Sequence, residues 1–180
     1  MKDQVKMTVF NRKINVEIDW IDDAAFEIHG TLDDNVHSLD SRIRVSFPDF
    51  RITDATAIIT RMPYPGFCQG STAAISGLVG EKIGRGFRKR SGEVLGGAAS
   101  CNHLHTLVND MTVCAFQMNY YAARQNPDAD ALMKEAEADM GRRRMLVLEW
   151  MPQLRNSCYV FSEASDPLFE AAAPKPADER

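Results

Sequence analysis

The chain has 180 residues, 44% of them hydrophobic, which is enough for one well-packed domain and short for two. Its formal net charge of −4 argues against a general nucleic-acid binder, and no apolar stretch approaches the ~20 residues that span a bilayer. Because the N-terminal residues also lack the apolar core of a secretion signal, we expect a cytoplasmic protein with no nucleic-acid or membrane partner.

Apolar and polar residues alternate in three segments of the first third of the chain, a pattern that predicts half-buried β-strands, and a fourth segment is rich in the β-branched residues that strands favour. In the second segment, for example, Phe26, Ile28 and Leu32 share one side, while Glu27, His29 and Thr31 share the other. Short turns between the segments favour antiparallel pairing. The predicted strands cover residues 12–20, 25–32, 42–47 and 50–60.

The polar segment Asp33–Ser41 is predicted to be a loop between the second and third strands. Its charged and polar side chains would stand at one end of the sheet. Asp34, His37 and Asp40 could therefore reach a site from this loop.

Prolines end the strand pattern after Arg61. Pro63 and Pro65 disfavour helical geometry at the residues before them, so Cys68 is expected on a bend between the sheet and a helix. A short helix is predicted over residues 73–79, capped by Ser71 or Thr72. The segment Gly84–Arg90 is expected to open another short helix or a loop.

The longest helix is predicted to begin near Ser100 or Asn102, either of which can cap it, and to run to Arg124. Its apolar residues recur at three- and four-residue steps, which predicts one face packed against the sheet. These residues are Leu104, Leu107, Val108, Met111, Ala115, Met118 and Ala122.

Pro127 should end this helix, and a polar, peripheral helix is expected over residues 128–140. Residues 142–150 fit either a helical continuation or a covering segment. From residue 171 the composition is that of a disordered end. We therefore predict an α+β fold in which an antiparallel sheet of about four strands is covered by a long helix from the C-terminal half and by shorter helices. One domain would span residues 1–170, with a disordered tail over residues 171–180.

Residues with reactive side chains gather between Arg61 and Leu107. The segment holds Cys68 at the predicted bend, and Cys101, His103 and His105 at the start of the long helix. If the two places adjoin, a thiol and an imidazole would meet, which suits either an activated nucleophile or part of a metal site. On a helix, Cys101 and His105 would share a face and His103 would point elsewhere.

Plainer roles for these side chains remain open. A single cysteine is commonly a small buried residue, and a histidine on a helix commonly caps it or forms a hydrogen bond. Cys114 and Cys158 fit packing roles. The spacing of the four cysteines favours reduced thiols over a disulfide framework.

A glycine- and arginine-rich segment, residues 84–90, could bind an anion. Glycines let backbone N–H groups approach an oxyanion, and arginine guanidinium groups suit phosphate. The segment could hold the phosphates of coenzyme A, although a solvated basic surface explains the same residues. The residues concerned are Gly84, Arg85, Gly86, Arg88 and Arg90.

Three motifs in this region occur in a fixed order: Pro63-Tyr64-Pro65-Gly66-Phe67-Cys68, then Ile83-Gly84-Arg85-Gly86-Phe87-Arg88, then Cys101-Asn102-His103-Leu104. Over residues 12–124 the chain resembles a bacterial family of domains of unknown function, in which a Pro-Tyr-Pro segment and a Gly-Cys-Thr-His-Leu element recur around a similar sheet. Ser100 and Asn102 stand where that family tends to have Gly and Thr. The resemblance implies no mechanism.

The order of elements is also similar to that of iron–sulfur scaffold proteins of the NifU type, in which cysteines and a histidine converge at one end of a sheet. That resemblance would match Cys68 to the bend cysteine and Cys101 or His103 to the late ligand. This chain has no cysteine before Cys68 to match the ligand of the first hairpin, which counts against cluster assembly.

Two functions of different class follow as hypotheses. The first, which we favour, is hydrolysis of an acyl-CoA thioester, such as that of an aromatic acid in small-molecule catabolism, at a catalytic site drawn from Cys68, Cys101, His103 and His105. No cofactor is required, since coenzyme A enters as part of the substrate. The second is a zinc- or iron-binding accessory or scaffold protein using Cys68, Cys101, His103 and Asp40. A ligand-binding domain without chemistry is a third interpretation, and formation of a homo-oligomer is left open.

Overall fold

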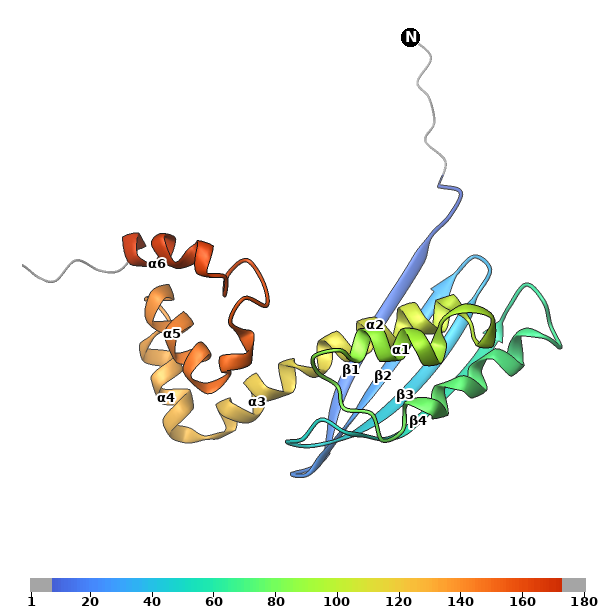
Figure 1. The fold of residues 1–180 in the computed structure, drawn as a ribbon, viewed down its shortest axis with the longest axis horizontal. Helices are drawn as coiled ribbons and strands as arrows, with labels where there is room; N and C mark the ends of the chain where they lie inside the picture. The colour runs from blue at the N-terminus through green and yellow to red at the C-terminus, as the bar shows by residue number, and fades with distance from the viewer. Residues whose placement is uncertain (1–7, 173–180) are drawn as a thin grey trace, which may run out of the picture. The chain divides into compact units, whose positions relative to one another are not determined.

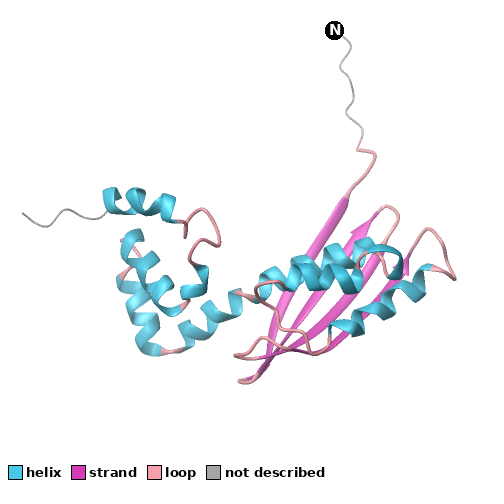
Figure 2. Cartoon of the chain, in the orientation of Figure 1, coloured by secondary structure: helices cyan, strands magenta, loops and turns pink. Residues whose placement is uncertain are grey.

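The computed structural model describes residues 8–172 and contains one four-stranded antiparallel sheet (Figures 1 and 2). The strands follow one another in chain order across the sheet. They are β1 (Arg12–Asp22), β2 (Ala25–Asp34), β3 (Ser38–Ser46) and β4 (Ile52–Arg61). The predicted α+β class and four-stranded antiparallel sheet are confirmed.

The register of the strands places the apolar residues on one face of the sheet. Ile18 of β1 pairs with Ile28 of β2, which in turn pairs with Ile43 of β3. Ile28 and Ile43 are completely buried. The alternate residues face away from this core, and on β2 they include Glu27, His29 and Thr31. The sheet therefore has a covered face and an open, polar face, as its period-2 pattern requires.

Helical elements cover the apolar face. They are η1 (Cys68–Leu78), α1 (Phe87–Leu95), η2 (Gly97–Ala99) and α2 (Asn102–Ala115) (Figure 1). Helix α2 packs closely on β2 at Gly30, where an added Cβ atom would lie 2.5 Å from the Met111 sulfur. A residue without a side chain is what allows this close approach of helix and strand.

The predicted loop over Asp33–Ser41 is mostly wrong, because β2 and β3 extend into it from both sides. Only residues 35–37 form the turn. The Asp34 carboxylate accepts hydrogen bonds from the backbone N–H groups of Val36 and His37, and the Asp34 N–H donates to the His37 carbonyl over 2.8 Å. Because the aspartate accepts the hydrogen bonds of the backbone N–H groups in the turn, the hydrogen-bonded ladder between β2 and β3 can continue to its last residues.

The predicted helix over residues 73–79 is instead the longer 3₁₀ helix η1. Neither Ser71 nor Thr72 caps it. Their hydroxyl groups donate to the carbonyl groups of Cys68 and Gln69, three residues back, over 2.6 and 3.0 Å. Side-chain hydrogen bonds of this spacing accompany the tighter i to i+3 winding.

The predicted long helix is present but is interrupted at Phe116, between α2 and α3 (Gln117–Gln125). The Phe116 ring stacks on Phe50 with the ring centroids 6.0 Å apart. The sequence predicts one domain over residues 1–170, whereas the chain forms two compact units that divide between Phe116 and Gln117.

The second unit is helical. After α3 it contains α4 (Pro127–Glu135), α5 (Met140–Trp150), η3 (Pro152–Leu154), η4 (Glu163–Ser165) and α6 (Asp166–Ala172). Met133, Val147 and Met151 form a small core of its own. Residues 142–150, for which the sequence allows two interpretations, are therefore part of a helix. Of the predicted disordered tail, residues 171–172 belong to α6 and residues 173–180 lie outside the described part of the chain. Within the described residues, no helix is long and apolar enough to cross a membrane.

Candidate functional site

A thiol and an imidazole meet at the start of α2. The Cys101 sulfur lies 3.6 Å from His103 Nδ1, within the reach of a hydrogen bond to sulfur. Cys101 is the N-cap residue of α2, with extended backbone angles (φ −108°, ψ 124°). Because it stands before the first helical turn, the helical spacing does not govern its direction, and it faces His103 rather than sharing a face with His105.

The imidazole of His103 packs on that of His37, from the turn between β2 and β3. The two ring centroids are 3.8 Å apart and the ring planes are 27° from parallel. His37 Nδ1 in turn lies 3.3 Å from the Asp34 carboxylate. Cys101, His103, His37 and Asp34 therefore form a continuous row of side chains that joins the helix start to the end of the sheet.

Asp34 anchors this row. Arg12 donates to its Oδ2 from Nε over 2.9 Å and from Nη2 over 2.6 Å. Burial opposes ionisation of Asp34, but hydrogen bonds from the backbone of Val36 and His37 and from the side chains of Arg12 and His37 outweigh it and hold its pKa well below its usual range. Asp34 is therefore a fixed negative charge at the base of the site.

The surroundings of His103 favour its neutral form. Burial is the largest cause, and electrostatic interactions with His37 and Arg12 add to it, so the pKa of His103 is lowered even though Asp34 acts in the opposite sense. A neutral imidazole at physiological pH can accept a proton.

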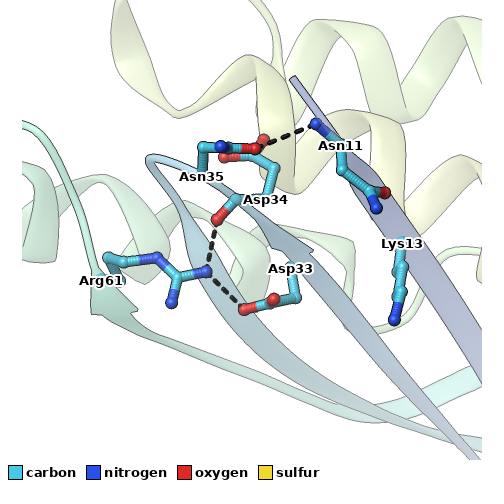
Figure 3. Close-up of a pocket in the computed structure, with 6 residues that line it drawn as sticks. All are labelled: Asn11, Lys13, Asp33, Asp34, Asn35 and Arg61. Atoms are coloured by element: carbon cyan, nitrogen blue, oxygen red, sulfur yellow. Dashed lines mark hydrogen bonds and ion pairs between the residues drawn. The ribbon is translucent and has the colours of Figure 1, made fainter. Parts of the chain in front are cut away.

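Arg61, at the end of β4, holds the β2–β3 turn in place (Figure 3). Its guanidinium donates to the Asp33 carboxylate over 2.6 Å, to the Asp34 carbonyl, and to the His37 carbonyl over 3.2 Å. On the other side of the turn, Asn35 Oδ1 accepts from the Asn11 backbone over 2.9 Å. These contacts fix the loop that carries His37, so the His37 ring is positioned before any ligand binds.

An open, mostly apolar pocket of about 490 Å³ adjoins the Cys101 thiol, and we call it the thiol pocket. Cys68, expected on a bend between the sheet and a helix, is the first residue of η1 and lines this pocket. In the turn that precedes Cys68, Tyr64 is 68% exposed to solvent and Phe67 is 85% exposed, and both residues line the pocket. The full lining is Tyr64, Phe67, Cys68, Ser71, Ser100 and Cys101.

The other predicted site residues lie elsewhere. His105 faces α1, where its Nε2 is 3.5 Å from the Ser91 hydroxyl. Asp40 occupies the open face of the sheet and contacts His29 Nε2 over 2.7 Å. As His103 stands on the covered face, Asp40 cannot join it in one metal site. Ser100, a predicted cap of α2, donates instead to the Ser71 carbonyl over 3.0 Å.

The glycine- and arginine-rich segment begins α1, with Gly86 in the left-handed conformation (φ 88°) as its N-cap. Gly84 and Arg88 line a pocket of about 180 Å³ near the C-terminal end of α2. Arg90 is paired with Glu81 over 2.8 Å and Glu93 over 3.2 Å, whereas Arg85 and Arg88 form no ion pair with the described residues. The residues that line this pocket along and just after α2, between Asn109 and Phe116, lie 8 to 15 positions after Cys101, which corresponds to roughly 12–22 Å along a helix axis.

The family model for proteins of unknown function (DUF2889) matches residues 4–117, which is more than half of the chain. The chain belongs to this family. The matched region contains every residue of the thiol pocket and of the row from Asp34 to Cys101. No match to the chain was found among curated proteins or among solved structures.

Within the DUF2889 region, three side chains could also hold a cation. Asp34, His37 and His103 each offer one ligand atom, and these atoms all lie within 4.8 Å of one another. The chemistry of the carboxylate weighs against this use, because both of its oxygens already accept hydrogen bonds and one of them contacts the cationic Arg12. A metal would have to displace Arg12 or share Asp34 with it.

The sequence predicts part of this candidate site. It singles out Cys68, Cys101 and His103, and it names Asp34 and His37 as residues that could reach a site. It misses Arg12, whose position before the first apolar residue of a strand carries no functional signal. It also misses Tyr64 and Phe67 as pocket residues, although both stand in the proline motif before Cys68.

Proposed function

We propose that the protein hydrolyses acyl thioesters, with Cys101 as the nucleophile and His103 as the general base. The proposal is carried by the 3.6 Å contact between the Cys101 sulfur and His103 Nδ1 at the edge of the thiol pocket. A thiol with an adjacent base, itself oriented by a further group, is the arrangement that nucleophilic catalysis uses. Here His37 and Asp34 orient the base.

The reaction proceeds in two steps. The Cys101 sulfur attacks the thioester carbonyl while its proton moves to His103 Nδ1, and the departing thiolate takes that proton to leave as a free thiol. Water then attacks the acyl-cysteine carbonyl as His103 accepts a proton from it. This proton returns to the Cys101 sulfur as the carboxylic acid departs.

Negative charge develops on the carbonyl oxygen in both steps. The first N–H groups of a helix have no partner within the helix, and Cys101 makes no side-chain cap to them. Residues 102–104 therefore offer N–H donors next to the nucleophile, which can stabilise the oxyanion.

The thiol pocket favours a flat, apolar acyl group. Tyr64 and Phe67 are aromatic side chains with most of their surface exposed, and aromatic faces stack on planar groups. This supports the aromatic acyl-CoA thioesters that the sequence suggests. Arg85 and Arg88 would meet the phosphates only if coenzyme A extends along α2 from the pocket.

A hydrolysis screen over aromatic and aliphatic acyl-CoA esters tests the proposal. Cys101→Ala should lower kcat by about 10³-fold or more, and His103→Ala by about 10²-fold or more. Cys114→Ala is the matched control, because this thiol lies near the C-terminal end of α2, outside the thiol pocket. Rapidly quenched wild-type protein should carry the acyl group on Cys101, as detected by peptide mass spectrometry.

Substrate truncation separates the roles of the two ends of α2. Replacing Arg85 and Arg88 together by alanine should raise KM for an acyl-CoA but leave KM for the same acyl group on N-acetylcysteamine unchanged, since the shorter thioester has no phosphates. Absence of turnover with every ester, or turnover that survives Cys101→Ala, would reject the proposed hydrolase.

A second candidate function, metal binding, is favoured by the convergence of Asp34, His37 and His103. Zinc or iron bound by these residues, with Cys101 nearby, would give the accessory protein of the alternative hypothesis. Elemental analysis of protein purified without added metal tests this, with His37→Gln compared with the open-face control His29→Gln. Less than about a tenth of an equivalent of metal excludes a tight site.

A further inference from the structure

Two cysteines from distant parts of the chain line one pocket. Cys68 opens η1 and Cys101 precedes α2, and both are partly buried in the wall of the thiol pocket. The proposed hydrolysis uses Cys101 alone. Cys68 therefore has a position next to the reactive thiol that the hydrolytic reaction does not explain.

Hydrogen bonds tie the two cysteine segments together. The Ser100 hydroxyl, beside Cys101, donates to the Ser71 carbonyl over 3.0 Å, and the Ser71 hydroxyl donates to the Cys68 carbonyl over 2.6 Å. All four residues line the thiol pocket. The backbone around one thiol is thus held against the backbone around the other.

Both segments can also adjust to bring the sulfur atoms together. Cys68 begins an 11-residue 3₁₀ helix, a length at which the i to i+3 hydrogen-bond geometry is poor. Cys101 follows Gly96 and Gly97, and Gly97 has a positive φ of 67°. A disulfide needs the sulfur atoms about 2 Å apart, so its formation requires one of the two segments to shift into the open pocket that both thiols line.

We propose that Cys68 is a resolving cysteine, which forms a reversible disulfide with Cys101 when the protein meets a peroxide. His103 accepts the Cys101 proton, and the thiolate attacks the peroxide, so that an S–O bond forms and the O–O bond breaks. One molecule of water or alcohol leaves, and Cys101 is oxidised to a sulfenic acid. The Cys68 sulfur then attacks the Cys101 sulfur, and the S–S bond replaces the S–O bond with release of water.

The disulfide would act as a reversible cap on the site. It occupies the nucleophile and draws Cys68 and Cys101 together across the pocket, so an acyl group can no longer reach the sulfur. It also keeps Cys101 from irreversible oxidation to a sulfinic acid. A dithiol reductant restores both thiols.

Thiol counting and peptide mapping test the proposal on the full chain. The folded protein is treated with one equivalent of hydrogen peroxide, and its free thiols are then counted after unfolding. Their number should fall from four to two. Mass spectrometry after alkylation should find residues 68 and 101 in one disulfide-linked peptide pair. Dithiothreitol should restore all four thiols.

Variants distinguish this pairing from other oxidation. With several equivalents of hydrogen peroxide, Cys68→Ser should form no linked pair, and Cys101 should pass through sulfenic acid to sulfinic acid as a second peroxide oxidises it. The double variant Cys114→Ser/Cys158→Ser should form the pair as the wild type does. Pairing of Cys101 with Cys114 or Cys158, or chiefly between two molecules, would overturn the proposal. So would equal sulfinic acid formation in the wild type and Cys68→Ser.

Disulfide formation can be separated from hydrolysis. It is measured on the protein itself and needs no thioester turnover, so a chain that forms the pair but hydrolyses nothing rejects the proposed hydrolase and retains the resolving cysteine. A chain that hydrolyses thioesters but forms no Cys68–Cys101 pair retains the hydrolase and rejects the resolving cysteine.

Discussion

Each face of the β2–β3 strand pair carries an aspartate–histidine contact, and the two contacts have different surroundings. On the open face, Asp40 and His29 approach to 2.7 Å but keep 37% and 24% of their side-chain surfaces exposed. On the covered face, Asp34 and His37 are 3.3 Å apart, and the Asp34 side chain has no exposed surface. The shorter contact is screened by water, while the longer one belongs to a buried network.

The difference shows what makes a polar pair functional in this fold. Among residues 8–116, the helices pack on the covered face, so within this unit the imidazole of His29 has no thiol beside it. The covered face places His37 against His103, and His103 against Cys101. Burial, backbone donors and a neighbouring nucleophile, rather than the distance between one acid and one imidazole, separate the candidate site from a surface ion pair.

Replacing Asp34 and Asp40 one at a time should give the largest difference in the free energy of unfolding between two variants. Asp34→Asn should lower the free energy of unfolding by about 3 kcal/mol, because it removes the charge that pairs with Arg12 and turns an amide NH2 group toward that guanidinium, while Oδ1 can still accept from the two backbone N–H groups. Asp40→Asn should cost less than about 1 kcal/mol, since water already solvates that pair. Urea denaturation measures both.

The contribution of Asp34 should also depend on pH. Its pKa is lower in the folded chain than in the unfolded one, so the stabilisation is complete above the unfolded value of about 3.9 and is lost as the pH falls through the folded value. The difference between wild type and Asp34→Asn should therefore shrink below about pH 4. A difference that stays constant in acid would show that Asp34 acts through shape rather than charge.

A smaller contrast is expected from neighbouring residues of β2 on opposite faces. Gly30→Val should destabilise the first unit by about 1–3 kcal/mol, because the new side chain must displace Met111 and Leu107 of α2. Thr31→Val, on the open face, should change stability by no more than about 0.5 kcal/mol. Thermal or urea unfolding tests the pair, and equal effects would mean that α2 is not packed tightly on β2.

The sheet and its two faces could be predicted from residues alone, because apolar residues at every second position leave few registers that bury Ile28 and Ile43 together. The candidate site could be predicted only in part. Cys101 and His103 are two residues apart and stand out by their chemistry, but their contact depends on Cys101 being the cap rather than part of the helix. No local pattern distinguishes those two cases.

Long-range contacts account for the rest. The row from Asp34 to Cys101 joins residues whose proximity follows from how α2 packs on the sheet, and Arg12 joins it through its pairing with Asp34 in the β1–β2 ladder. Asp40 is a reasonable ligand only if Asp33–Ser41 is a loop. Because the strands extend through that segment, the period of two assigns Asp34 to the covered face and Asp40 to the open one.

The smallest expected effect is a shift in the pH dependence of the proposed hydrolysis. As the general base, His103 must be neutral, so kcat/KM should fall as the pH drops through its pKa, which lies below the ordinary histidine value of about 6.5. Burial lowers this pKa most and the charge of His37 adds to it. His37→Gln removes that charge but not the burial.

The acid limb of the kcat/KM profile should therefore move to higher pH in His37→Gln. The kcat/KM on the plateau above about pH 7 should fall only to the extent that loss of the ring contact makes the position of His103 less fixed. His29→Gln is the matched control, and its profile should superimpose on that of the wild type, because His29 stands on the other face of the sheet. A shift of the limb to lower pH in His37→Gln, or the same shift in both variants, would mean that the residue titrating in the acid limb is not His103.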